Sequence, residues 1–437
     1  MRVISTDKWF YVLRRLSKRM WFRASLYCGL AVLTALVGVV VQPVLPPGLA
    51  GRFGADAVGN ILSILATSML AVTTFSLATM VSAYGAASQS ATPRAANLLI
   101  EDNGAQGALA TFIGAFLFSI AGLIALSTDI YGDGGRVVLF AATVAVIVLI
   151  TVTLLRWIEQ LSRFGRVSET INLVEAATHK AMQARAKAPW MGGVPAGMAP
   201  PQGTAIEAAD VGHVEHLDME RLQSVADRLG CDIHIRSLPG TLAMPGRPLV
   251  VVVGAIDDEG IDKVRDAFSI GDARTFENDP RYGLIVLNEI AIRALSPAIN
   301  DPGTCIDIIG TVVRLFTGWS EARSTHADPA EILYPGIHVP AVQEADMYDD
   351  VFPSIARDGA HMREIGIKLQ KALSALNLCK YEPMRTPARQ HAADALARAM
   401  AAMSFEADRE SVCHVALVSK GGDDSVASIC LDADGRT

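Results

Sequence analysis

Charged side chains are scarce in this chain: Asp, Glu, Lys and Arg make up 19% of its 437 residues, and 51% are hydrophobic. A soluble domain usually contains about a quarter charged residues. The shortage is greatest in four stretches that contain none of these residue types, at 24–51, 57–93, 103–128 and 137–155. This distribution excludes an ordinary soluble protein and indicates a membrane protein.

Each uncharged stretch is long enough to cross the hydrocarbon core as a helix, which needs about 20 residues. We predict four transmembrane helices, at 24–45, 59–83, 106–127 and 137–155. A helix satisfies its own backbone hydrogen bonds in lipid, which offers none. No Asp, Glu, Lys, Arg or His lies within these spans, which disfavours an ion-coupled pump and a voltage sensor.

Basic residues predict the orientation of the spans. Six Lys and Arg residues lie between positions 8 and 23, and Arg156, Arg163 and Arg166 follow the fourth span, whereas each expected outer loop contains one Arg. By the positive-inside rule, both termini face the cytoplasm. Residues 1–166 contain 13 basic and 7 acidic residues, and residues 167–437 contain 25 basic and 38 acidic residues. A membrane part is therefore expected before an acidic cytoplasmic part.

Familiar catalytic and metal motifs are missing. The chain has no H-E-x-x-H, G-x-S-x-G, G-x-x-x-x-G-K-[ST] or G-x-G-x-x-G sequence. Its six cysteines are scattered without a C-x-x-C pair, which predicts free thiols in a reducing compartment. His213 and His216 lie three apart in an expected strand and would point to opposite faces. We expect no enzyme activity, no metal site and no cofactor.

One face of the second span is polar or small along its whole length. With about 100° of rotation per residue, Asn60, Ser63, Thr67 and Thr74 lie within a sector of about 60°. Such residues commonly line helix contacts in membranes. Alternatively, several copies of this helix around an axis would form a hydroxyl-lined aqueous path that favours cations. Both interpretations remain open.

The uncharged stretch 57–93 is longer than the membrane is thick, since a helix of this length reaches about 55 Å. Its inner end is expected to project into the cytoplasm, where Pro93 disfavours helix at Thr92 and predicts a bend before Arg94. We predict an inner mouth that includes Tyr84, Gln89 and Arg94.

Six segments are predicted along the chain. They are a basic cytoplasmic segment (1–23), a four-helix transmembrane domain (24–156), a helical extension with a Pro- and Gly-rich linker (157–208), a small cytoplasmic α/β module (209–256), a cytoplasmic helical domain (257–405) and a tail or hairpin (406–437). In the module, strands are expected at 212–217, 231–235 and 249–253, with a helix capped by Asp218. The fold class is a membrane all-α domain followed by an α/β module and a helical C-terminal bundle.

Two Asn-Asp-Pro sequences predict helix starts in the cytoplasmic domain. Each supplies a capping acceptor and a proline for the first turn, giving helices at about 280–295 and 302–317. Asp328-Pro329 is a third candidate start, and longer helices are expected at 353–377 and 387–405. The charged residues around these starts have an ordinary explanation as caps and ion pairs. They are also a candidate ligand or gating site: Arg274, Asp279, Arg293, Asn300 and Asp301.

Four sequence patterns resemble a known family. They are Ser-Gln-Ser-Ala-Thr-Pro-Arg-Ala-Ala-Asn-Leu-Leu-Ile-Glu-Asp (88–102), Gly-x-Val with two later Pro-Gly turns (212–249), Ala-Phe-Ser-Ile-Gly-Asp-Ala-Arg-Thr (267–275) and Arg-Ala-Leu-Ser-Pro-Ala-Ile-Asn-Asp-Pro-Gly-Thr (293–304). Over most of residues 10–405 the chain resembles the bacterial predicted membrane protein family called domain of unknown function 2254. The resemblance implies a bacterial inner-membrane protein with four spans and a cytoplasmic domain, and it implies no activity.

Two classes of function agree with these patterns. The first is a homo-oligomeric inner-membrane ion channel whose pore is lined by the second span and regulated by the cytoplasmic part. The second is a membrane-anchored sensor or scaffold that signals through its cytoplasmic domain. The expected partners are the lipid bilayer, further copies of the chain and inorganic ions, without nucleic acid.

Overall fold

The computed structural model describes residues 55–100, 103–127, 133–161, 166–197, 201–325, 331–420 and 429–430, together with single helical positions at 22, 25, 29, 33 and 37. The chain divides into two compact units, residues 1–170 and 171–437. The first predicted span, 24–45, lies almost wholly outside the described residues.

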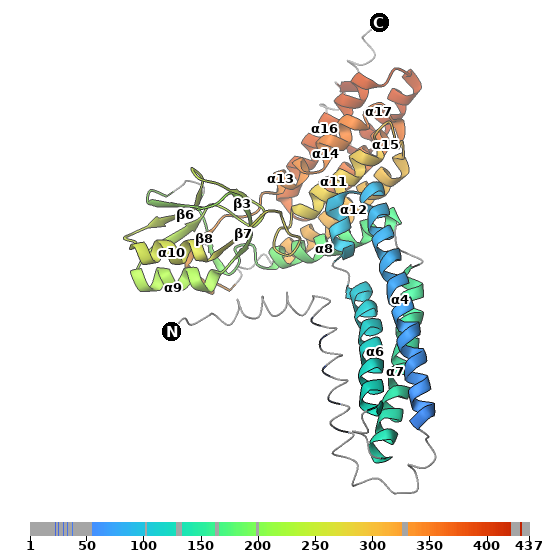
Figure 1. Cartoon of the computed structure of the whole chain (residues 1–437). Helices are drawn as coiled ribbons and strands as arrows, with labels where there is room; N and C mark the ends of the chain where they lie inside the picture. Colours follow the sequence, from blue (N-terminus) through green and yellow to red (C-terminus); the bar gives the residue numbers. More distant parts are fainter. Residues whose placement is uncertain are drawn as a thin grey trace. The chain divides into compact units, whose positions relative to one another are not determined.

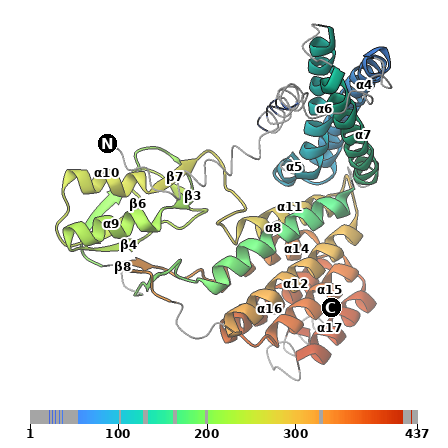
Figure 2. The ribbon, with the colours of Figure 1, turned by 90° about the horizontal axis from the view of Figure 1, so that it is seen from below.

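Three long helices dominate the first unit: α4 (Ala55–Ser90), α6 (Asn103–Ser127) and α7 (Asp133–Leu161). They lie side by side in both views (Figures 1 and 2). Among the described residues, three segments are long and apolar enough to span a membrane, at Ala57–Gln89, Gly104–Ser127 and Arg136–Leu161. These segments agree with the second, third and fourth predicted spans.

The predicted bend after the second span is present. Helix α4 ends at Ser90, and the short helix α5 (Pro93–Ile100) begins at the proline. The hydroxyl of Thr92 accepts a hydrogen bond of 3.2 Å from the backbone N–H of Ala95, so it caps the new helix.

The second unit combines an α/β module with a helical bundle. The module has a five-stranded sheet in the order β1-β8-β4-β6-β2 and a three-stranded antiparallel sheet in the order β5-β3-β7. The strands are β1 (Gly193–Pro195), β2 (Thr204–Glu207), β3 (Gly212–Leu217), β4 (Asp232–Ile235), β5 (Leu242–Ala243), β6 (Pro248–Val253), β7 (Phe268–Gly271) and β8 (Tyr334–Val339).

Helices α9 (Met219–Leu229) and α10 (Asp258–Asp266) lie along one face of the five-stranded sheet (Figures 1 and 2). As predicted, Asp218 caps α9 by accepting a hydrogen bond of 2.9 Å from Arg221 N. The predicted strands at 212–217, 231–235 and 249–253 correspond to β3, β4 and β6. Alternation places Ile233, Ile235 and Ile337 on the buried side, where they join one apolar core.

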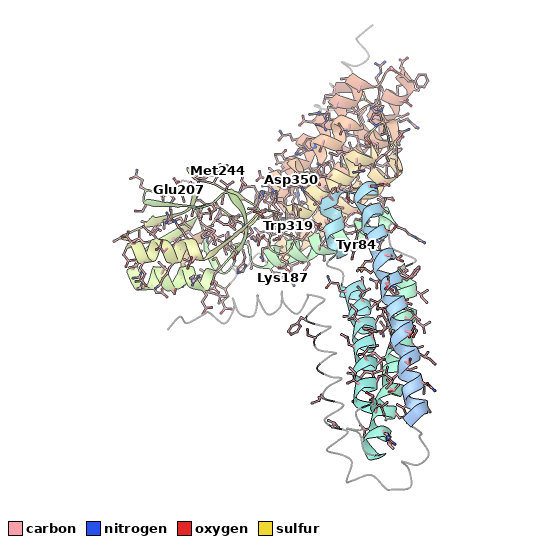
Figure 3. The ribbon with its side chains drawn as sticks, viewed as in Figure 1. Tyr84, Lys187, Glu207, Met244, Trp319 and Asp350 are labelled. Carbon is pink, nitrogen blue, oxygen red and sulfur yellow. A yellow bond between two sulfur atoms is a disulfide. The ribbon has the colours of Figure 1, made fainter. Side chains whose placement is uncertain are left out.

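The bundle contains α8 (Val167–Lys187), α11 (Tyr282–Ala294), α12 (Pro302–Thr325), α13 (Glu344–Asp349), α14 (Phe352–Asp358), α15 (Arg363–Asn377), the 3-10 turn η2 (Glu382–Met384), α16 (Arg385–Ala402) and α17 (Glu406–Lys420). The aromatic rings of Phe316, Tyr348 and Phe352 contact one another in its core. Trp319 is also fully buried there, on α12 (Figure 3).

The structure corrects the predicted segment 157–208. Helix α7, which contains the fourth predicted span, is described to Leu161, and α8 is a separate helix with Glu169 in its first turn and Arg185 and Lys187 in its last, charges that suit the two helix ends. The predicted linker contains strand β1, which pairs in parallel with β8. Composition could not reveal this strand, because its partner lies about 140 residues further along the chain.

The predicted module, 209–256, was too small. Strands β1 and β2 precede it, and α10, β7 and β8 follow it in the chain. The third candidate helix start, Asp328-Pro329, lies outside the described residues, and residues 334–339 just beyond it form a strand. The long helix predicted at 353–377 is two helices, because α14 ends before Gly359 and α15 begins at Arg363.

The C-terminal segment differs from the predicted tail or hairpin. Residues 406–420 form helix α17, in which Val412 and Ala416 are fully buried and one helical turn apart. Cys413 and Cys430 form a disulfide, so the prediction of free thiols was wrong for this pair. Cys231, Cys305 and Cys379 are free and buried, and Cys28 lies outside the described residues.

Candidate functional site

The polar stripe of α4 lies on the exposed side of the helix. Asn60, Ser63, Thr67 and Thr74 are all exposed. The opposite side, about 180° around the helix, carries the buried residues Val58, Leu62, Met69, Ser76 and Met80. The apolar side therefore packs within the first unit, and the hydroxyl-bearing side remains open.

Two hydroxyl groups of the stripe donate hydrogen bonds to backbone carbonyls of their own helix. Thr67 Oγ1 donates to the carbonyl of Ser63 at 3.0 Å, and Thr74 Oγ1 donates to the carbonyl of Leu70 at 2.9 Å. A hydroxyl has one proton and two lone pairs, so these oxygens remain available as acceptors. Acceptor oxygens can replace water around a cation, whereas an anion requires donors.

Large apolar side chains border the stripe. Leu70 and Leu77 lie on one side and Ile64 and Phe75 on the other, and all four are between 48% and 68% exposed. The open face therefore consists of a narrow polar strip between two apolar margins, a composition that suits contact with another membrane helix.

The three predicted inner-mouth residues occupy α4 and α5 on either side of the bend. Tyr84 lies on the last part of α4 and is partly buried (Figure 3). Gln89 lies at the end of α4 and Arg94 at the start of α5, and both are exposed.

In the second unit, the predicted residues Arg274 and Asp279 form an ion pair. Arg274 Nε donates to Asp279 Oδ2 at 2.7 Å, and Asp279 is only 3% exposed. The other carboxylate oxygen, Oδ1, accepts from the backbone N–H groups of Arg281 and Tyr282 at 3.0 and 3.2 Å. Asp279 therefore stabilises the turn that leads into α11, and the helix begins at Tyr282, two residues after the proline, rather than at Pro280 as predicted.

The other predicted residues lie at the opposite end of α11. Asp301 caps α12 by accepting from Thr304 N and Thr304 Oγ1 at 3.1 and 2.6 Å. Asn300 has a φ of 51°, a left-handed conformation that asparagine tolerates better than most residues. Arg293 Nε is buried and has no hydrogen-bond partner among the described residues. Because α11 is about 20 Å long, the predicted set of five forms two separate groups.

Sequence reasoning missed most of the polar network around Asp279. Arg281 Nε and Nη2 donate to the two carboxylate oxygens of Asp350 at 2.7 and 3.0 Å, and Nη1 donates to Asp346 at 2.6 Å. Burial raises the pKa of Asp350, against the opposing effect of Arg281. Arg281 follows the predicted helix start directly, but no local pattern singles it out, because its acidic partners lie more than 60 residues away in the chain.

Asn278 connects the α/β module to the bundle. Its side-chain Nδ2 donates to the carbonyl of Glu215 on β3 at 3.1 Å, and its own carbonyl accepts from Arg185 Nη2 on α8 at 3.4 Å. Arg185 is 7% exposed, and burial lowers its pKa to about 10 although Asp279 acts in the opposite direction. We call Arg185, Arg274, Asn278, Asp279, Arg281 and Asp350 the junction network.

The chemistry of the junction network is ionic and structural. Its carboxylates are engaged by guanidinium or backbone N–H groups. No group of three or more His, Cys, Asp or Glu residues in the described part of the chain is arranged to hold a metal ion. The network is built to hold the module and the bundle in a defined relation.

Comparisons with known proteins identify the family of this chain. Uncharacterized proteins of Mycobacterium bovis and of two Mycobacterium tuberculosis strains are each 52% identical to the chain over 40 residues, which is 9% of this chain and 8% of each relative. No solved structure matches the chain. A family model described as Predicted membrane protein (DUF2254) matches residues 17–375. The chain therefore belongs to this family of predicted membrane proteins.

Proposed function

We propose that the protein is a homo-oligomeric ion channel of the bacterial inner membrane, with both termini in the cytoplasm and a pore lined by Asn60, Ser63, Thr67 and Thr74. The observation that supports this proposal is the exposure of all four side chains on the side of α4 opposite its packing face.

A polar stripe is stable in a membrane only where its polar groups find hydrogen-bond partners. Facing lipid, the Asn60 amide would have no hydrogen-bond partner, and unsatisfied polar groups are costly in hydrocarbon. Copies of α4 arranged around an axis would turn the stripes towards water at the centre. The apolar margins at Leu70, Leu77, Ile64 and Phe75 would then contact neighbouring copies.

The permeant species in this proposal is a cation. Thr67 and Thr74 offer acceptor oxygens, because their protons are bonded to their own helix. The acidic excess after residue 166, 38 acidic against 25 basic residues, would raise the cation concentration near the inner mouth. Screening over about 8 Å at physiological salt limits this second effect to charges close to the opening.

A second candidate function is a membrane-anchored sensor or scaffold. It is favoured by the junction network, since a polar, directional connection between module and bundle is suited to transmitting a change from one to the other. In the channel proposal, the same network serves regulation. Neither function needs catalysis or a cofactor.

The test is ion flux through purified protein in liposomes. We expect a cation current that falls several-fold in Thr67→Leu and Thr74→Leu, since leucine makes the path drier. Thr151→Leu is the matched control: Thr151 is exposed on α7 and makes the same bond to its own helix, at 2.9 Å to the Ile147 carbonyl.

Three results would each contradict part of this proposal. If the purified protein gave no current, and crosslinking produced no species larger than a monomer, the anchored sensor would be favoured. Equal loss of current in Thr151→Leu would place the path elsewhere. An anion-selective current would leave the channel standing and refute the cation preference.

A further inference from the structure

The Cys413–Cys430 disulfide attaches the C-terminal segment to the bundle. Cys413 lies on α17, and Cys430 follows 17 residues later, with a Cα–Cα distance of 6.0 Å. Ile429 and Cys430 pack against an apolar cluster of α16 and α17 residues: Leu396, Ala399, Met400, Met403, Val412 and Ala416. The Met400 sulfur lies 3.5 Å from the Cys413 sulfur. The bond therefore fixes residues 429–430 on the surface of these two helices.

The other described cysteines have different surroundings. Cys231, Cys305 and Cys379 are at most 9% exposed, and burial raises the pKa of each thiol, to about 12 for Cys305. A thiol with a raised pKa rarely ionises and reacts slowly. Cys413 and Cys430 are only partly buried, so a small thiol in solution can reach their bond.

The compartment in which the second unit lies determines whether this disulfide is permanent or reversible. The basic flanks of the spans predict a cytoplasmic second unit, where thiol reductants keep most cysteines reduced. A disulfide that forms there is usually transient and responds to the redox state. A permanent structural disulfide would instead be expected outside the cytoplasm.

We propose that Cys413 and Cys430 form a thiol-disulfide switch that fastens residues 429–430 to α16 and α17 under oxidising conditions and releases them on reduction. The oxidant is a low-molecular-weight disulfide, such as glutathione disulfide. Its two sulfurs accept two electrons and two protons from the Cys413 and Cys430 thiols, so that one protein disulfide and two small thiols result. Excess small thiol drives the same exchange in reverse.

The switch acts on the stability of α17. Helix α17 packs along α15, where Val412 lies 3.1 Å from the position of a β-carbon on Gly366 and Asp408 pairs with Arg363 at 3.6 Å. Closing a loop of 17 residues restricts the unfolded segment, so the oxidised form holds α17 in place more strongly. Reduction is expected to increase local opening at this end of the bundle.

The experiment measures thiol state in cells that express the full chain. Cells are treated with diamide or left untreated, quenched in acid, and the denatured chain is labelled with a maleimide that adds mass. We expect untreated cells to show both thiols reduced and diamide to remove two labels. The loss should vanish in Cys413→Ser and Cys430→Ser and persist in Cys379→Ser, the matched buried control.

Hydrogen exchange of the purified full chain provides a second readout. Amides of α17 should exchange at least about tenfold faster in excess glutathione than in glutathione disulfide, because the loop constraint is lost. Cys413→Ser should exchange at the faster rate in both buffers.

Several outcomes would overturn the switch. A disulfide that is complete in untreated cells with a cytoplasmic C-terminus, shown by a topology reporter, would make it a structural link. A C-terminus on the outer side would remove the reducing environment on which the proposal depends. If the amide hydrogen exchange rates of α17 were the same in both glutathione buffers, the disulfide would not stabilise this helix.

Discussion

The Arg274 guanidinium and the Asp279 carboxylate, bonded at 2.7 Å, lie directly beneath the Pro239-Gly240 turn of the α/β module. Gly240 has a φ of 92°, and a β-carbon there would overlap Asp279 Oδ2. The turn can therefore approach the ion pair only because residue 240 has no side chain.

Gly240→Ala should destabilise the second unit by about 2–4 kcal/mol. The alanine would be strained in the left-handed backbone conformation, and its β-carbon would also displace the buried Asp279 carboxylate. Gly246→Ala is the control, because Gly246 has a φ of 83° but no atom within 4 Å of its β-carbon position. It should cost only about 1 kcal/mol. Thermal unfolding of the purified chain measures both. Equal losses would show that Asp279 simply moves aside.

Gly283→Ala should separate α8 from α11. The side chain of Thr178 on α8 occupies the space that a β-carbon on Gly283 would need, so overpacking of about 1–3 kcal/mol is expected. Gly310→Ala on α12 should instead increase stability. Its nearest atoms would lie 3.9 Å away, and alanine favours a helix by about 0.5–1 kcal/mol. Calorimetry that found both variants destabilised would contradict this packing.

Asp301→Ala should lower stability by about 0.5–2 kcal/mol through loss of the α12 cap. The hydrogen bonds from Thr304 lower the pKa of Asp301. The ionised cap therefore contributes stability above about pH 3.8, which is lost as the pH falls through the lowered folded value. Asp307→Ala, at an exposed site in the same helix, should change stability by less than about 0.5 kcal/mol. If Asp301→Ala left stability intact but abolished ion flux, the site would be functional.

His391 should make the bundle sensitive to mild acid. Burial lowers its pKa, although Asp349 at 3.2 Å and Asp394 act in the opposite direction, and we judge burial dominant because Asp349 is largely exposed to water. Its ring lies against Tyr348 and Phe352. Since the unfolded histidine binds a proton first, at about pH 6.5, its contribution to stability falls as the pH decreases through that value.

The measurement is the melting temperature between pH 7.5 and pH 5.5. His391→Gln should show a smaller decrease over this interval than the unmodified chain, whereas His361→Gln, at an exposed position, should show the same decrease. An unchanged slope in His391→Gln would assign the acid sensitivity to other groups.

Local patterns predicted local structure well in this chain. Pro302 begins α12 and Asp218 caps α9 because capping depends on residues within one helical turn. The polar stripe of α4 was predicted as one narrow face because helical rotation alone determines it. The same reasoning could not say which side of α4 packs within the unit, since that depends on α6 and α7.

Features made by distant residues were not predictable. The partners of Arg281, the pairing of β1 with β8 and the Cys413–Cys430 bond each join residues that no short sequence window contains. The break between α14 and α15 was missed for a different reason: at this turn the backbone of Gly359 lies against Ile365 of α15, where a β-carbon at residue 359 would lie 2.5 Å from the isoleucine side chain. Periodicity alone predicted one continuous helix there.

Strand β8 has a consequence for how the chain is made. It lies between β1 and β4, parallel to both, yet it leaves the ribosome after α11 and α12. Until about residue 340 has emerged, β1 has no partner and one edge of β4 is open. A ribosome adding about 5–20 residues per second would leave that edge exposed for several seconds after β7 is complete. The nascent module is thus vulnerable to pairing with another chain in this interval.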